Sequence, residues 1–218
     1  NADLAKHLQD YLDKNSVPYN VSVLELIAQH MKERVNFVHE MYTNAKYLYQ
    51  NPTEFDTDTI AKRWKDESAE TVAKIKAMVG EEEDAIEKAK IVYEYVQSKT
   101  RYISIQLGIG GWKPMEVSDV EKYGYGDCKA LSNFTRAILK AFDIESYYTV
   151  IYGGDLKKFN QEIISMQGNH VIVSVPTDNN YIFLECTSQT NPFGYLSDFT
   201  SNRNALIIKP DGAEVVNT

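Results

Sequence analysis

A cysteine at the start of a predicted helix is the residue of this chain best placed for chemistry. Cys128 follows the glycine-rich run Tyr-Gly-Tyr-Gly-Asp at residues 123–127, and the last residue of that run, Asp127, is a favourable helix N-cap. Apolar residues then recur at helical spacing as far as Phe142. Cys128 therefore falls in the first helical turn, where unpaired N–H groups and the helix dipole stabilise a thiolate and could hold a developing oxyanion.

A thiolate needs a base, and His170 is the only histidine after residue 40. It opens the apolar run 171–175, which predicts a short buried strand. A second strand is predicted at 181–187, and the two strands are typical of an antiparallel hairpin. Glu185 is an ionisable group on this second strand, and a buried carboxylate is costly unless it is paired. The order of thiol, imidazole and carboxylate matches the nucleophile, base and orienter of covalent acyl transfer.

Five motifs carry a resemblance to a known family: Thr100-Arg101-Tyr102-Ile103, Gly110-Gly111-Trp112, Tyr125-Gly126-Asp127-Cys128-Lys129, Asn169-His170-Val171 and Leu184-Glu185-Cys186-Thr187. From about Ala85 to Thr218 the chain resembles the bacterial transglutaminase-like superfamily, the papain-related group with a Cys-His-Asp triad. The resemblance implies an α+β fold with a central cysteine-bearing helix packed against an antiparallel sheet. It also implies Cys128, His170 and Glu185 as catalytic residues, with Glu185 where the family usually has Asp.

The predicted function is cysteine-dependent acyl transfer on the amide bonds of a protein or peptide substrate, by hydrolysis or transamidation through a thioester. This chemistry needs no cofactor and no metal. Two other interpretations stay open. The domain could be a catalytically silent protein-binding module, because Glu185 replaces the usual Asp. Alternatively, the helical part of the chain could be the functional unit and bind tRNA.

The second cysteine is predicted to belong to the core. Cys186 is adjacent to Glu185 on a predicted strand, so the two side chains should point to opposite faces. A Cys128–Cys186 disulfide is allowed arithmetically, but two cysteines in 218 residues are not a disulfide framework. A zinc site built from Cys128, His170 and Cys186 would lack the close paired spacings of common zinc sites.

Three residues are candidates for substrate binding. Trp112 lies in a glycine-flanked loop upstream of the cysteine and could wall the acyl-binding cleft. Gln106 and Asn169 could donate amide N–H groups to an oxyanion or to the histidine, and the sequence does not rank them. The polar connection at 153–168 has the length and position of a flap over the cleft.

The first eighty residues show helical periodicity throughout, so the predicted domains are a helical region at 1–80 and a transglutaminase-like domain at 81–218. The segments 32–38, 52–56 and 62–66 are similar to the C-terminal anticodon-binding helical region of bacterial glutamyl-tRNA synthetases, over about residues 1–68. The nucleotide-binding signatures of a class I synthetase, His-x-Gly-His and Lys-Met-Ser-Lys-Ser, do not occur. The chain is therefore not expected to aminoacylate tRNA by itself.

The charge of the chain argues against anionic partners. The formal net charge is −8 and the pI is about 5.1, whereas nucleic-acid binding normally shows a basic footprint. Residues 1–78 hold ten Lys or Arg against twelve Asp or Glu, a net charge of −2, so any tRNA binding through residues 1–80 should be weak. No stretch of eighteen apolar residues occurs, so no membrane span is expected. The oligomeric state and the compartment, periplasm or cytoplasm, stay open.

Overall fold

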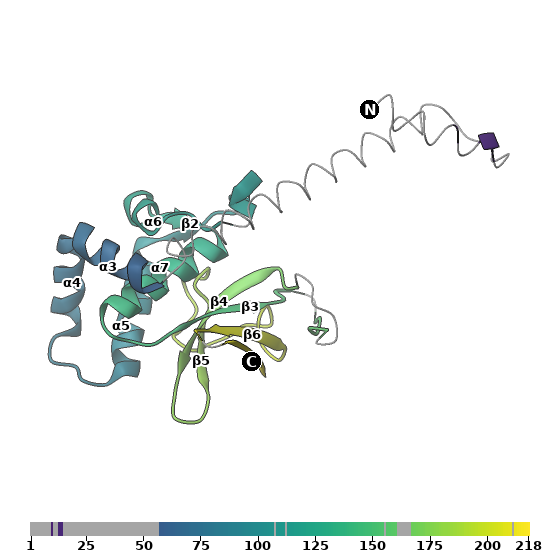
Figure 1. Cartoon of the computed structure of the whole chain (residues 1–218). Coiled ribbons are helices and arrows are strands. Elements are labelled where there is room, and N and C mark those ends of the chain that lie inside the picture. Colours follow the sequence, from purple (N-terminus) through teal and green to yellow (C-terminus); the bar gives the residue numbers. More distant parts are fainter. Residues whose placement is uncertain are drawn as a thin grey trace. The chain divides into compact units, whose positions relative to one another are not determined.

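The computed structural model of the chain describes residues 10, 13, 14, 57–106, 108–111, 113–154, 156–160, 167–210 and 212–218 (Figure 1). The chain forms two compact units, Asn1–Pro52 and Thr53–Thr218. The helices predicted between residues 3 and 49 lie outside the described residues, apart from Asp10, Asp13 and Lys14, which are helical. The second unit carries all three predicted catalytic residues.

The unit Thr53–Thr218 combines helices with an antiparallel sheet, which confirms the α+β prediction. Its helices are α3 (Thr57–Glu67), α4 (Ala69–Val79), α5 (Ala85–Lys99), a short 3-10 helix (Gly108–Gly111), α6 (Val117–Tyr123) and α7 (Cys128–Ala141). Its main strands are β3 (Tyr147–Ile151), β4 (His170–Pro176), β5 (Tyr181–Leu184), β6 (Asn204–Lys209) and β7 (Gly212–Asn217), in the order β5-β4-β3-β6-β7. A small parallel pair, β1 (Arg101–Tyr102) and β2 (Tyr125–Gly126), precedes α7.

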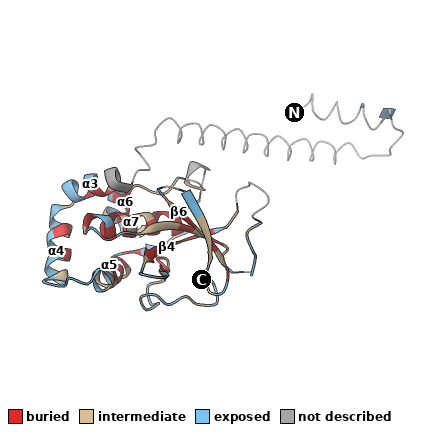
Figure 2. Cartoon of the chain, turned by 60° about the horizontal axis from the view of Figure 1, so that its bottom comes forward, coloured by how far each residue is buried: buried red, intermediate tan, exposed pale blue. Residues whose placement is uncertain are grey.

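The helix α7 lies at the centre of the larger core, as the family resemblance implies for the cysteine-bearing helix. Most of its residues are buried, and Figure 2 shows the buried residues concentrated on α7 and β4. Its apolar side chains share one cluster with Val173, Val175 and Leu184 from the sheet and with residues of α3 to α6. A second cluster, which includes Ile172 and Ile207, covers the other face of the sheet.

The strand β4 shows why the chain around His170 is fixed. Its residues from His170 to Val175 are all buried, and it pairs antiparallel with β3 on one side and β5 on the other. Successive side chains alternate between faces, so Val173 and Val175 pack toward α7 while Ile172 packs into the second cluster. The predicted hairpin is confirmed, and its turn is closed by the Thr177 N–H donating to the Asn180 carbonyl at 2.8 Å. Its second strand, predicted at 181–187, ends at Leu184, so Glu185 lies just beyond the strand.

The helices α3 and α4 belong to the same core as α7, which differs from the predicted boundary near residue 80. Trp64 is 2 % exposed and packs edge-on against Phe134 of α7, with ring centroids 6.3 Å apart. The Trp64 indole N–H donates to the Glu121 carboxylate at 2.6 Å, and the Thr71 hydroxyl donates to the same carboxylate. Amphipathic periodicity predicts that a helix buries one face but does not identify the element against which that face packs. For this reason α3 and α4 fall within the predicted helical region at 1–80.

Within the described part of the chain, no helix combines the length and the apolar character needed to cross a bilayer.

Candidate active site

Cys128 is the first residue of α7, and its position is set by the loop before it. The Asp127 side chain accepts from the Ala130 N–H at 2.9 Å and pairs with the Lys129 ammonium, which caps the helix as predicted. A Cβ atom on Gly126 would lie 2.8 Å from the Ala130 Cβ, so this entry into the helix favours glycine. Cys128 is therefore held, 4 % exposed, in the first turn, where helix N–H groups lack intrahelical partners.

His170 and Glu185 form a buried pair beside this cysteine. The His170 Nε2 lies 2.9 Å and 3.1 Å from the two carboxylate oxygens of Glu185. The Thr187 N–H and hydroxyl donate to Glu185 Oε1 at 3.2 Å and 2.6 Å, and the Thr200 hydroxyl lies 3.5 Å from Oε2. The carboxylate is thus paired and hydrogen-bonded on both oxygens, as a buried charge requires.

The pKa shifts link the three side chains. Burial alone would lower the pKa of His170, but its hydrogen bonds with Cys128 and Glu185 outweigh that effect and raise the pKa to about 9. Burial would raise the pKa of Glu185, but its bonds to His170 and Thr187 hold the pKa below the usual range. Glu185 thus occupies Nε2 of the imidazole, and the Cys128 thiol lies close enough to His170 to raise its pKa.

The raised pKa of His170 makes stability depend on pH. The folded pKa of about 9 lies above the unfolded value near 6.5, so the stabilisation is fully present below pH ~6.5 and is lost as pH rises toward 9. We expect the unfolding free energy to fall across this window by on the order of 2–3 kcal/mol more in the wild type than in His170→Asn. Urea denaturation at a series of pH values measures this, and parallel profiles for the two proteins would contradict it.

The turn that follows Glu185 is held by α5. The Tyr93 hydroxyl donates to the carbonyls of Glu185 and Asn191, each at 3.2 Å, and the Gln97 amide donates to the carbonyls of Ser188 and Asn191 at 2.8 Å and 2.9 Å. Sequence reasoning missed this support, because Tyr93 and Gln97 have the ordinary spacing of one helical face. The Tyr93 hydroxyl and the Gln97 amide thus hold the backbone of the turn that carries the Glu185 carboxylate.

A tyrosine of β3 also lies near the cysteine. Burial is the main cause that raises the pKa of Tyr148, and the nearby Cys128 and Asp127 side chains raise it further. The Arg136 guanidinium lies 5.9 Å from the centre of the Tyr148 ring. Tyr148 therefore lies close to the start of α7, although nothing in the sequence singles it out.

Of the three predicted substrate-binding residues, two lie among the described residues, and they have different surroundings. Gln106 is exposed in the loop after β1, and Trp112 lies outside the described residues. The Asn169 side chain is occupied by Gly153, whose N–H donates to Oδ1 at 2.6 Å and whose carbonyl accepts from Nδ2 at 3.1 Å. Asn169 thus ties together the two ends of the predicted flap at 153–168, of which residues 155 and 161–166 are not described.

A pocket of about 300 Å³ lies beside the start of α7. Its lining includes Ile105, Gly110 and Met115 from the loop before α6, Asp119 from α6, and Asp127 next to the cysteine. Gly110 of the glycine-flanked segment therefore lines a cavity together with Asp127, while Trp112, the residue predicted to wall the cleft, is outside the described residues.

The second cysteine lies in the main core, as predicted. Cys186 is 5 % exposed, and burial raises its pKa to about 12. Both cysteines are free, so the disulfide alternative does not describe this structure. Among the described residues, no group of three or more His, Cys, Asp or Glu side chains is arranged to hold a metal ion.

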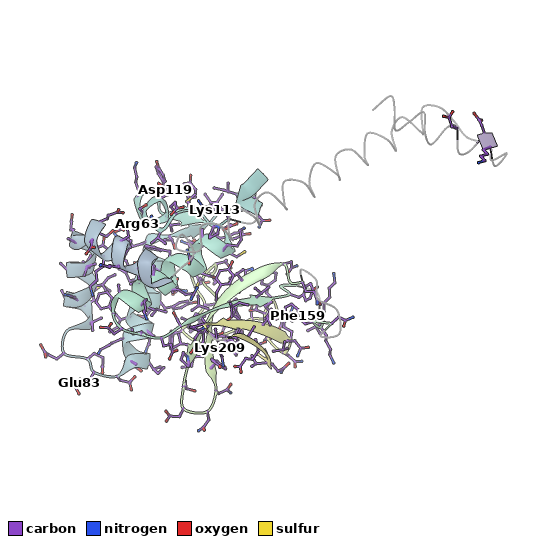
Figure 3. All side chains as sticks on the ribbon, in the orientation of Figure 1. Arg63, Glu83, Lys113, Asp119, Phe159 and Lys209 are labelled. Carbon is purple, nitrogen blue, oxygen red and sulfur yellow. The ribbon has the colours of Figure 1, made fainter. Side chains whose placement is uncertain are left out.

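The basic residues around Trp64 are largely engaged within the unit. Arg63 pairs with Glu116 at 3.0 Å, and the Lys65 ammonium donates to the Ala141 carbonyl at 2.9 Å. Lys113 pairs with the same Glu116 at 3.1 Å, and Figure 3 shows Arg63 and Lys113 on the same side of the unit. These three side chains therefore make ion pairs or hydrogen bonds within the unit Thr53–Thr218 and do not form an open basic patch.

Two family models match the chain. One describes a transglutaminase-like superfamily and matches residues 69–186, and the other describes an anticodon binding domain and matches residues 3–98. Both resemblances expected from the sequence are thereby confirmed. The matches overlap at 69–98, which contains all of α4 and nearly all of α5, and both helices contribute to the core around α7.

Curated relatives match part of the chain. The glutamate–tRNA ligase of Bacteroides fragilis is 37% identical over 71 residues, which are 32% of this chain and 14% of that protein. The ligase of Chlorobium phaeobacteroides is 44% identical over 54 residues, 25% of this chain and 10% of that protein. The chain thus spans only a small fraction of the ligases it matches.

Two solved structures are similar to the chain at low identity. A candidate protease from Parabacteroides distasonis gives a TM-score of 0.47 at 16% identity, covering 74% of this chain and 30% of that one. A candidate cysteine protease from Cytophaga hutchinsonii gives a TM-score of 0.42 at 14% identity, covering 69% of this chain and 47% of that one.

Proposed function

Because the chain belongs to the transglutaminase-like superfamily, we propose that it catalyses cysteine-dependent acyl transfer on the amide bonds of a protein or peptide substrate. The observation that carries the proposal is the His170 imidazole, which is bonded to the Glu185 carboxylate at Nε2 and interacts with the Cys128 thiol. A nucleophile, a base and a group that orients the base are the parts that this chemistry needs.

In the first half of the reaction, His170 takes the thiol proton and the Cys128 sulfur attacks the amide carbonyl carbon. The charge that develops on the carbonyl oxygen is held by N–H groups of the first turn of α7, with the Cys128 N–H as the nearest donor. His170 then gives its proton to the leaving nitrogen. The C–N bond breaks, a free amine departs, and the acyl group stays on Cys128 as a thioester.

In the second half, water or an amine attacks the thioester. His170 takes a proton from the attacking group, the C–S bond breaks, and the Cys128 thiolate is released opposite the protonated imidazole. Water gives hydrolysis and an amine gives transamidation. We favour hydrolysis of peptide or amide bonds as the main reaction, because water is always available as an acceptor.

The replacement of the usual Asp by Glu185 is compatible with this role. The longer side chain starts from the turn after β5, and hydrogen bonds from Thr187 hold its carboxylate within 2.9 Å of the His170 Nε2. An orienting carboxylate needs reach and a fixed direction, and both are supported here. The alternative of a catalytically silent binding module rested on Glu185 standing where the family usually has Asp, and the reach of the glutamate to His170 weakens that argument.

A chromogenic ester tests the proposal without a known substrate. With p-nitrophenyl acetate and the full chain, we expect a burst of p-nitrophenolate close to one equivalent and an acetyl group on the Cys128 peptide in mass spectrometry. Cys128→Ser should abolish the burst and His170→Ala should slow it by at least about 100-fold. Cys186→Ser, which removes a buried thiol from the same fold, should leave it unchanged. Acetylation of Cys128 at the same rate in the wild type and in His170→Ala would contradict the proposal and favour a binding module.

A further inference from the structure

The turn Ser197–Arg203 contacts both members of the histidine–glutamate pair. The Phe199 ring lies edge-on to the His170 imidazole, with ring centroids 5.1 Å apart and an interplanar angle of 72°. The next residue, Thr200, places its hydroxyl 3.5 Å from Glu185 Oε2. Neither residue belongs to the motifs that identify the family in the sequence.

A buried arginine holds this turn in place. Arg203 is 4 % exposed, and its guanidinium donates to the carbonyls of Tyr152 and Gly154 at 2.9 Å and 2.8 Å. It also donates to the carbonyl of Ser201 at 3.0 Å, while the Gly154 N–H donates to the Phe199 carbonyl at 2.9 Å. A guanidinium taken out of water needs such partners. The turn is consequently fixed to the end of β3.

The Phe199 ring packs against Gly153, where the absence of a side chain leaves room for it. A Cβ atom on Gly153 would lie 2.5 Å from the ring and 3.1 Å from the His170 Cβ. The ring therefore fills the space over Gly153 and rests against the imidazole, which is itself only 7 % exposed. In spite of these contacts, Phe199 remains 46 % exposed. A large apolar surface is thus presented to solvent next to the base.

We propose that Phe199 is a specificity-determining residue that contacts an apolar side chain on the amine side of the transferred acyl group. The inference rests on the proposed function. In that reaction His170 exchanges a proton with the leaving or attacking amine, so the amine nitrogen must come within hydrogen-bonding reach of the imidazole. The Phe199 ring touches the same imidazole. The first side chain attached to the amine nitrogen therefore lies beside Phe199, and burying an apolar group there is favourable.

The amine site can be examined from the acceptor side, since amide cleavage and aminolysis pass through the same thioester. After p-nitrophenyl acetate has acetylated Cys128, an added amine attacks the carbonyl carbon, its proton passes to His170, and the C–S bond breaks. Leucinamide and glycinamide, amines of similar basicity, serve as competing acceptors against water. The acetylated products are quantified by mass spectrometry.

We expect leucinamide to be acetylated about tenfold faster than glycinamide, since a few methylene groups in apolar contact give discrimination of that order. Phe199→Ala should bring the ratio close to one, while Phe199→Leu, which keeps an apolar side chain, should retain most of it. The ratio of the two acetylated amines is measured from the same acetyl-enzyme in each variant, so it reports the amine step whatever the rate of the initial acetylation. Met78→Ala, which removes a side chain of similar exposure from α4, is the matched control.

The outcomes separate this inference from the function on which it rests. A thioester on Cys128 with equal use of the two amines, or a leucinamide preference that survives Phe199→Ala, would overturn the role of Phe199 alone. Failure to form any thioester on Cys128 would overturn the proposed function and this inference with it. A preference that disappears together with the initial acetylation would show that Phe199 supports the base and does not select the amine.

Discussion

Glu185→Gln is expected to slow the acetylation of Cys128 by on the order of 100-fold, because the positioning carboxylate loses its charge. The neutral amide keeps the size of the side chain but no longer stabilises the protonated imidazole. The pKa of His170 should therefore fall from about 9 toward its ordinary value. The burst of p-nitrophenolate gives the rate, and NMR titration of the His170 ring gives the shift.

Glu185→Asp is the matched control for this prediction. It keeps the negative charge but shortens the side chain that now reaches within 2.9 Å of the His170 Nε2. We expect it to retain a raised pKa at His170 and an acetylation rate within about tenfold of the wild type. If Gln and Asp at this position behaved alike, or if neither altered the rate, Glu185 would be a structural residue and not the orienter of the base.

Trp64→Ala is expected to reduce the unfolding free energy by about 3–5 kcal/mol, the cost of removing a large aromatic side chain from a core. The substitution removes the edge-on contact with Phe134 and the indole hydrogen bond to Glu121. Because Phe134 lies on α7, the loss should weaken the helix that begins with the nucleophile. Urea denaturation followed by far-UV circular dichroism measures the effect.

Two variants make this test specific. Trp64→Phe keeps most of the apolar volume but loses the N–H donor, so it should cost about 1–3 kcal/mol. Met78→Ala changes an exposed residue of α4, 47 % exposed, and should stay within about 0.5 kcal/mol of the wild type. A Trp64→Ala effect below 1 kcal/mol would mean that α3 is not part of the core around α7.

The parts of the fold that could be predicted from the sequence are those with a local cause. Asp127 and the glycines before it predict a helix that starts at Cys128, and the helix begins there. The apolar run after His170 and the turn residues 178–180 predict the hairpin, and β4 and β5 form it. The short-range chemistry of caps and turns does not depend on the rest of the chain, so these elements are visible in the sequence.

The remaining features depend on contacts between distant segments. The packing of Trp64 against α7 and the support that Tyr93 gives to the Glu185 backbone join residues more than sixty positions apart. Phe199 lies in a turn with no strong pattern, and it meets His170 only because Arg203 fixes that turn to the end of β3. Asn169, predicted as a free amide donor, is engaged by Gly153. The periodicity of a sequence cannot encode such pairings.

The overlap of the two family matches has a physical interpretation. The anticodon-binding match extends to residue 98 and so includes α3, most of α5 and all of α4. In this structure these helices bury Trp64, Ile75 and Val92 in the core that carries Cys128, and Arg63 and Lys65 are bonded within the unit. Their apolar faces and part of their basic charge are thus used by the transglutaminase-like domain, which argues against a tRNA-binding role for them.

The most direct test of the central claim is the rate at which iodoacetamide alkylates Cys128 as a function of pH. Peptide mass spectrometry follows the labelling in the wild type and in His170→Ala, with the buried Cys186 as an internal control. An assembled thiolate–imidazolium pair predicts rapid labelling of Cys128 below pH ~7 that slows at least about tenfold in His170→Ala. Labelling of Cys128 that rises only near pH ~8.5, as for an ordinary thiol, and is the same in both proteins would contradict the account.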